Sequence, residues 1–162
     1  MQAIVQQLEK QDLEAFRSLI QIYVDIFGME DYLPITNDNL QNALQQPHFE
    51  VFVASINNKV VGGLTIYILK PYYSAKGIAY IYDLGVAEQY QRMGIGKQLL
   101  YHLKTFCAAN NLEEMYVQAE AIDRHAINFY RGTNPSSEME VVHFNYIINP
   151  ENKYDDFVRW SL

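Results

Sequence analysis

Two carboxylates stand where this chain could do acid–base chemistry. Asp83 lies inside the apolar run 80–86, and Glu120 directly follows the strand-like run 114–119. Burial raises the pKa of a carboxyl group and makes it a better proton acceptor near neutral pH. The two residues therefore predict a general base or a water-mediated relay, with a simple anchor for a cationic group as the alternative.

A second chemically suggestive segment is the run Gln-Arg-Met-Gly-Ile-Gly-Lys at residues 91–97, between a predicted strand and a predicted helix. Backbone N–H groups in the first turn of a helix lack acceptors and carry partial positive charge, so a phosphate group binds there. Gly94 and Gly96 would let the main chain approach a diphosphate, and Arg92 and Lys97 flank the helix start. A turn followed by close helix packing would also explain the two glycines.

Two common nucleotide-binding motifs do not fit this segment. The dinucleotide fingerprint needs G-x-G-x-x-G directly after the strand, but eight residues separate Gly85 from the glycine pair starting at Gly94, and no third glycine follows in register. The P-loop needs a hydroxyl residue after its lysine, and Gln98 follows Lys97 here.

The run Gln91-Arg92-Met93-Gly94-Ile95-Gly96 resembles the Q/R-x-x-G-x-G/A signature of the GNAT-type N-acetyltransferases. Downstream, Asp123-x-x-Ala126-x-x-Phe129-Tyr130 is similar to that family's N-x-x-A-x-x-F-Y helix, with Asp in place of Asn. The resemblance covers residues 3–148. It implies a single α/β domain over 1–162, with a mixed central sheet, helices on both faces, splayed central strands and acetyl-CoA as cosubstrate.

The resemblance also implies roles for individual residues. The main chain of the strand end would pair with the pantetheine arm, and Tyr130 would protonate the departing thiolate, with Glu120 or Asp83 as base. The residues expected at acetyl-CoA are Leu84, Gly85, Val86, Gln91, Arg92, Met93, Gly94, Ile95, Gly96, Lys97, Asp123, Ala126, Phe129 and Tyr130.

Within the superfamily, the segments 80–84, 116–120 and 141–144 resemble those of class I aminoglycoside 3-N-acetyltransferases, and 27–31 is similar to their acidic loop. This implies transfer to the 3-amino group of a deoxystreptamine aminoglycoside and antibiotic resistance. A polyamine or peptide amine as acceptor, or an acyl-CoA-binding module without turnover, are the alternatives. The run 132–136 departs from the family's usual turn. The residues expected at the acceptor are Glu30, Asp31, Tyr82, Asp83, Glu120 and Asp123.

Composition agrees with a soluble acetyltransferase. The chain has 162 residues, 49% hydrophobic and 19% charged, and a formal net charge of −7. That charge argues against a nucleic-acid partner and would attract a polycation, although mildly acidic proteins are common. The single cysteine, Cys107, excludes an internal disulfide, and the four histidines show no metal-ligand spacing, so no metal is expected.

No segment has the pattern of a signal peptide or a membrane span, so a cytoplasmic location without membrane contact is expected. A homodimer remains open. The acidic and aromatic segment 154–157 could fold over the site, pack against a second subunit or remain a loose tail.

Hydrophobic periodicity and turn residues predict the elements that must position these groups. A helix begins after Asp12 and ends at Gly28, and a tight turn at Asn57-Asn58 joins two strands. The predicted strands are 3–6, 50–56, 59–69, 78–86, 114–119 and 138–148. The predicted helices are one capped by Asp12 that runs through Phe27, one that starts at 36 or 37 and stops before Pro47, 95–110 and 123–131.

Overall fold

The computed structural model describes residues 3–29, 35–146 and 148. It divides into two compact units, Met1–Val117 and Gln118–Leu162, which are described one at a time. Three predicted features, Glu30, Asp31 and the segment 154–157, lie outside the described residues.

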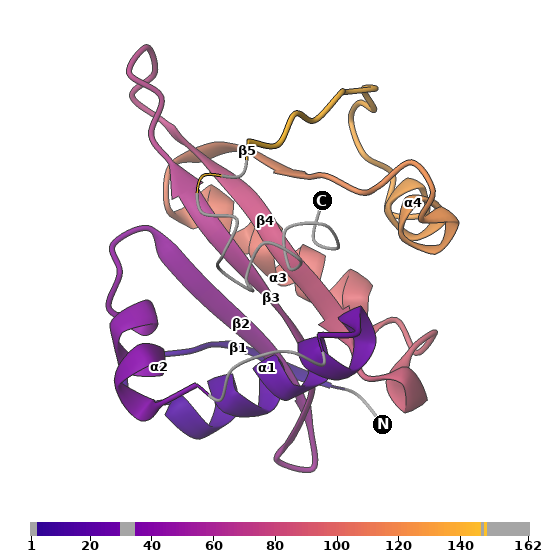
Figure 1. Cartoon of the computed structure of the whole chain (residues 1–162). Helices are drawn as coiled ribbons and strands as arrows, with labels where there is room; N and C mark the ends of the chain where they lie inside the picture. Colours follow the sequence, from indigo (N-terminus) through magenta and orange to yellow (C-terminus); the bar gives the residue numbers. More distant parts are fainter. Residues whose placement is uncertain (1–2, 30–34, 147, 149–162) are drawn as a thin grey trace. The chain divides into compact units, whose positions relative to one another are not determined.

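The first unit is a five-stranded mixed sheet with helices on both faces (Figure 1). The strands follow the order β1-β2-β3-β4-β5; neighbours are antiparallel from β1 to β4, and β5 runs parallel to β4. This confirms the predicted α/β class. The elements are β1 (Ile4–Gln7), α1 (Leu13–Phe27), α2 (Asn37–Leu44), β2 (Phe49–Ile56), β3 (Lys59–Leu69), β4 (Gly77–Val86), a 3-10 turn at Glu88–Tyr90, α3 (Ile95–Ala109) and β5 (Leu112–Val117).

Strand alternation in β2 shows how the helices cover the sheet. Val51 and Val53 belong to a buried cluster with Phe16 and Leu19 of α1. Phe52, between them in the sequence, instead makes edge-on ring contacts with Phe106 and His102 of α3. Because successive side chains of a strand point to opposite faces, α1 and α3 lie on opposite faces of the sheet.

Local turn chemistry follows the sequence closely, with one difference. Asn57 and Asn58 both have positive φ, 50° and 62°, as a two-residue hairpin turn requires, and Gly28 ends α1 in the left-handed region at φ 66°. Asp12 stands at the start of α1 as predicted. Its carboxylate, however, accepts a hydrogen bond from the Glu9 N–H at 2.8 Å and none from the helix.

The position of β5 differs from the predicted strand 114–119. The strand runs from Leu112 to Val117 because its register with β4 begins at Gly77 and ends at Ile81. Main-chain pairing with a distant strand, β4, sets the actual bounds, and the local sequence pattern does not show it.

The second unit contains α4 (Arg124–Arg131). The predicted strand 138–148 is wrong for the described residues, because 138–146 and 148 have no strand assignment and Val142, for example, is 78% exposed. A run of β-branched and aromatic residues favours extended backbone, but a strand also needs a neighbouring strand to satisfy its hydrogen bonds. Across the described part of the chain, none of the helices combines the length and apolar content that a membrane crossing requires.

Candidate active site

An irregularity in the pairing of β3 and β4 places the first candidate residue. Thr65 lies opposite Asp83, but the next residue, Ile66, lies opposite Ile81, so Tyr82 is an extra residue in β4. A bulge of this kind breaks the strict alternation of side chains and redirects the residues beside it. Asp83 consequently reaches Thr65 directly across the strand pair, while the ring of Tyr82 contacts that of Tyr67.

The Asp83 carboxyl group is held in a partly buried setting. Its Oδ2 accepts a hydrogen bond from Thr65 Oγ1 at 3.0 Å, and its own N–H donates to the same Oγ1 at 3.2 Å. Burial raises the pKa of Asp83 to about 6, against the opposing effect of the Thr65 hydrogen bond, which favours the carboxylate. A group with this pKa is ionised at neutral pH and can still accept a proton there.

The main chain that follows Asp83 has one edge beyond the reach of β5. Leu84, Gly85 and Val86 pair with β3 on one side, whereas the ladder between β4 and β5 ends at Ile81 and Val117. The pairing therefore ends just before the segment where splaying of the strands is predicted. Within the described residues of this unit, no strand occupies the other edge of β4 there, so its backbone groups can pair with an extended ligand arm.

The segment between β4 and α3 forms a tight loop with two left-handed residues. Arg92 has φ 61° and Gly94, the residue before α3, has φ 81°, while Gln91 Nε2 donates to the Val86 carbonyl at 3.0 Å. Ile95, Gly96 and Lys97 are the first three residues of α3. Their N–H groups lack acceptors within the helix because they lie in its first turn. A Cβ at Gly94 would meet nothing within 4 Å. The backbone at Gly94 is therefore open to a ligand, and diphosphate binding at this helix start remains a prediction.

Glycine is required at position 85 for a different reason from that at position 94. A Cβ there would lie 2.3 Å from Ile26 Cδ1 and 3.0 Å from the Tyr23 ring, both on α1. Gly85 therefore lets α1 cross close over β4.

The second unit carries the remaining described candidates. Asp123 Oδ1 accepts a hydrogen bond from the Ala126 N–H at 2.9 Å, so this carboxylate caps α4. The rings of Phe129 and Tyr130 meet edge to face at 5.0 Å, and both side chains are partly buried, as is Glu120. The chemical roles of Glu120, Asp123 and Tyr130 remain predictions.

Sequence reasoning missed Thr65 and Tyr67. Thr65 is the one buried polar side chain among the described residues, at 3% exposure, and it alone bonds the Asp83 carboxylate there. A threonine inside an apolar strand is ordinarily a β-branched strand former. Only the register of β3 against β4 shows that its hydroxyl faces a carboxylate.

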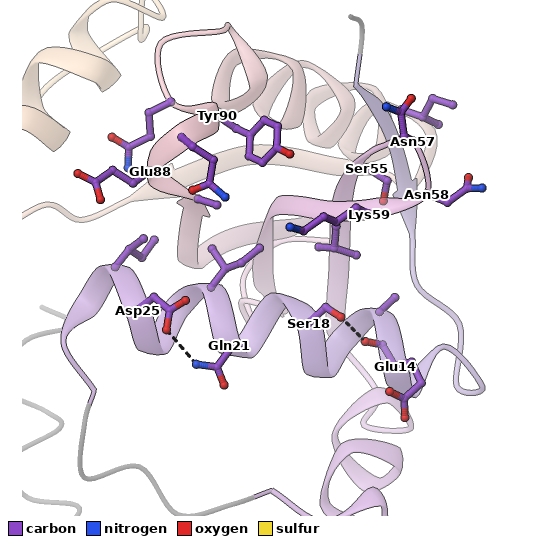
Figure 2. Close-up of a pocket in the computed structure, with 18 of the residues that line it drawn as sticks. Glu14, Ser18, Gln21, Asp25, Ser55, Asn57, Asn58, Lys59, Glu88 and Tyr90 are labelled. Atoms are coloured by element: carbon purple, nitrogen blue, oxygen red, sulfur yellow. Dashed lines mark hydrogen bonds between the residues drawn. The ribbon is translucent and has the colours of Figure 1, made fainter.

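A separate groove of about 1430 Å3 lies between α1, the turn joining β2 to β3, and the segment 87–91 (Figure 2). Its lining includes the carboxylates of Glu14, Asp25 and Glu88 and the ammonium of Lys59. Asp25 accepts a hydrogen bond from Gln21 Nε2 at 2.9 Å. The groove includes Gln91 of the loop before α3 but neither Asp83 nor the glycine pair, so its centre is distinct from the site described above.

The model of the acetyltransferase (GNAT) family matches residues 13–133. The solved aminoglycoside acetyltransferase meta-AAC0020, from an uncultured soil metagenomic sample, is similar in structures in complex with sisomicin (42% identity) and trehalose (43%); each covers 91% of this chain and 97% of its own, with a TM-score of 0.88.

A second soil-metagenome aminoglycoside acetyltransferase, HMB0005, is 28% identical over 92% of this chain and 100% of its own, with a TM-score of 0.86. Among curated proteins, the search gave no match.

Proposed function

The chain belongs to the acetyltransferase (GNAT) family, and from that premise we propose that it transfers the acetyl group of acetyl-CoA to an amine of an aminoglycoside. The observation that carries the substrate class is the 42–43% identity, over nearly the full length of both chains, to an aminoglycoside acetyltransferase solved with sisomicin. The 3-amino group of 2-deoxystreptamine is the proposed acceptor. It rests on the resemblance of 80–84 and 116–120 to class I 3-N-acetyltransferases.

Acetyl-CoA supplies an activated acyl carbon. Two consecutive segments of this chain are proposed to bind acetyl-CoA. The free edge of Leu84–Val86 pairs with the pantetheine arm, and the N–H groups at the start of α3 bind the diphosphate. Arg92 and Lys97, both exposed beside that loop, add positive charge. The open space at Gly94 supports this arrangement because a ligand can approach the backbone there.

The proposed reaction needs a proton acceptor and a proton donor. Asp83 takes the proton from the substrate ammonium, directly or through water, with Glu120 as the other candidate. The amine nitrogen then forms a bond to the acyl carbon as the carbon–sulfur bond breaks, and the sulfur leaves as a thiolate. Tyr130 is proposed to give that sulfur a proton. The acylated nitrogen then loses its second proton, which restores the phenol of Tyr130, directly or through water. The products are an uncharged amide and free CoA, and the proton held by Asp83 is released to solvent.

Release of CoA thiol tests the proposal most simply. With acetyl-CoA present, sisomicin and gentamicin should give thiol release at rates well above those for spermidine and for an amine-terminated peptide. Faster release with spermidine or the peptide would contradict the aminoglycoside assignment. CoA binding without release from any of these amines would indicate a binding module. Resistance is tested separately: expression of the protein in a susceptible bacterium should raise the inhibitory concentration of gentamicin.

A further inference from the structure

Tyrosine side chains from three adjacent strands meet on the α1 face of the sheet beside Asp83. We call this set the tyrosine wall: Tyr67 of β3, Tyr80 and Tyr82 of β4, and Tyr116 of β5. The ring of Tyr82 is perpendicular to those of Tyr67 and Tyr80, with centroids 5.4 and 6.1 Å away. Tyr80 and Tyr116 stack with centroids 5.0 Å apart.

The wall continues the core but is only partly covered. Phe16 of α1 contacts Phe49, with ring centroids 6.2 Å apart, and Phe49 contacts Tyr67 at 5.0 Å. Beyond this point exposure rises, to 36% for Tyr67 and 42% for Tyr82. A partly exposed aromatic surface next to a packed core is a feature of ligand-binding sites.

The electrostatics of the wall favour a cationic ligand with a ring. Burial first, then neighbouring phenols and the charge of Asp83, raise the pKa of Tyr67 and Tyr80 above the usual tyrosine value. The phenols of Tyr67 and Tyr80 therefore stay neutral at physiological pH. Asp83 is a negative group beside these two rings, and Glu114 is a second one beside Tyr116. Tyrosine faces attract cations, and an adjacent carboxylate strengthens that attraction.

We propose that the tyrosine wall binds an amino-sugar ring of the acceptor and holds its ammonium group toward Asp83. This inference rests on the proposed function and extends it from the reacting amine to the ring that carries it. A sugar ring presents C–H groups to an aromatic surface and hydroxyl groups to phenols, and the net charge of −7 favours a polycation over an anionic or neutral partner. Tyr82 is the central residue, since it contacts both Tyr67 and Tyr80.

Calorimetric titration of the full-length protein with sisomicin and with spermidine, without acetyl-CoA, tests the wall apart from catalysis. Spermidine is a polycation without a ring. Tyr82→Leu should raise the Kd for sisomicin about tenfold, the effect of losing roughly 1.4 kcal/mol, and change that for spermidine much less. Tyr82→Phe, which keeps the ring, should stay near wild type.

The matched control is Tyr101→Leu, because Tyr101 is 75% exposed and belongs to α3 on the opposite face. If circular dichroism shows that Tyr82→Leu does not fold, Tyr67→Leu is the alternative variant that removes a ring from the tyrosine wall. Unchanged sisomicin affinity, or equal losses for sisomicin and spermidine, would overturn the proposal even if sisomicin is acetylated. A changed oligomeric state of Tyr82→Leu with unchanged affinity would also overturn it, in favour of an interface between copies. If Tyr82→Leu weakens sisomicin binding but the wild-type protein acetylates no aminoglycoside, the proposed role of the tyrosine wall is supported and the proposed function is contradicted.

Discussion

The hydroxyl group of Thr65 both donates to and accepts from Asp83, at 3.0 Å to the carboxylate oxygen and 3.2 Å from the backbone N–H. A side chain that is almost fully buried thus fixes the one carboxyl group in this region whose pKa is raised to about 6. The bulge at Tyr82 allows this contact, because with the extra residue in β4 Thr65 lies directly opposite Asp83.

Thr65→Val should move the acid limb of the pH–rate profile upward. The Thr65 hydrogen bond stabilises the carboxylate, so its loss raises the pKa of Asp83 further, by about one pH unit for a hydrogen bond to a charged group. The measurement is kcat/KM between pH 5 and 9. Thr65→Ser keeps the hydroxyl and should restore the wild-type limb, whereas the same profile in all three proteins would show that Thr65 does not act on the base.

Asp83→Asn should make the protein more stable at pH 8 while lowering turnover at least 100-fold. The pKa of Asp83 is raised in the folded state, from 3.8 to about 6, so the folded protein prefers the protonated form. Its favourable contribution is complete below about pH 4 and is lost as pH rises through 6. Asparagine carries no charge and should recover about 1–3 kcal/mol at pH 8 and little at pH 4.

Thermal unfolding of wild type and Asp83→Asn at both pH values measures this difference. A variant that is less stable at pH 8, or one that retains wild-type kcat, would show that Asp83 is a structural carboxylate and that Glu120 is the remaining candidate for the base.

Gly94→Ala should weaken CoA binding about tenfold. The left-handed φ of 81° disfavours a Cβ, so the loop must shift and the N–H groups of the first turn of α3 lose their common direction. Gly28→Ala is the matched control, since Gly28 has φ 66° and equally open surroundings but ends α1. Both variants should lose about 1 kcal/mol of stability, and calorimetry should find weaker CoA binding only for Gly94→Ala.

Tyr130→Phe should lower kcat 10- to 100-fold and leave the Kd for CoA within about twofold, because the phenol proton is needed only as charge develops on the sulfur. The ring and its contact with Phe129 persist in the variant. Steady-state kinetics and CoA titration separate the two effects. An unchanged kcat would remove the proton-donor role from Tyr130.

Much of the first unit could be predicted from local sequence. The end of α1 at Gly28, the Asn57-Asn58 turn and the start of α3 after Gly94 each depend on residues close in the chain, and all three appear as predicted. The glycine motif likewise placed the loop before α3, because its conformation depends on Gly94 itself.

What could not be predicted depends on pairing between distant segments. The extra residue in β4 and the resulting contact of Thr65 with Asp83 follow from a register across 18 positions in sequence. The bounds of β5 follow from its ladder with β4. The described residues 138–146 and 148 form no strand, which shows that residue preferences without a partner strand do not determine structure.

The structure of the reaction product tests the central claim most directly. After incubation of the protein with acetyl-CoA and sisomicin, mass spectrometry and two-dimensional NMR should show one added acetyl group, on the 3-amino nitrogen of the deoxystreptamine ring. An acetyl group on another amine would contradict the proposed position. Recovery of unmodified sisomicin beside intact acetyl-CoA would contradict the aminoglycoside acetyltransferase assignment itself.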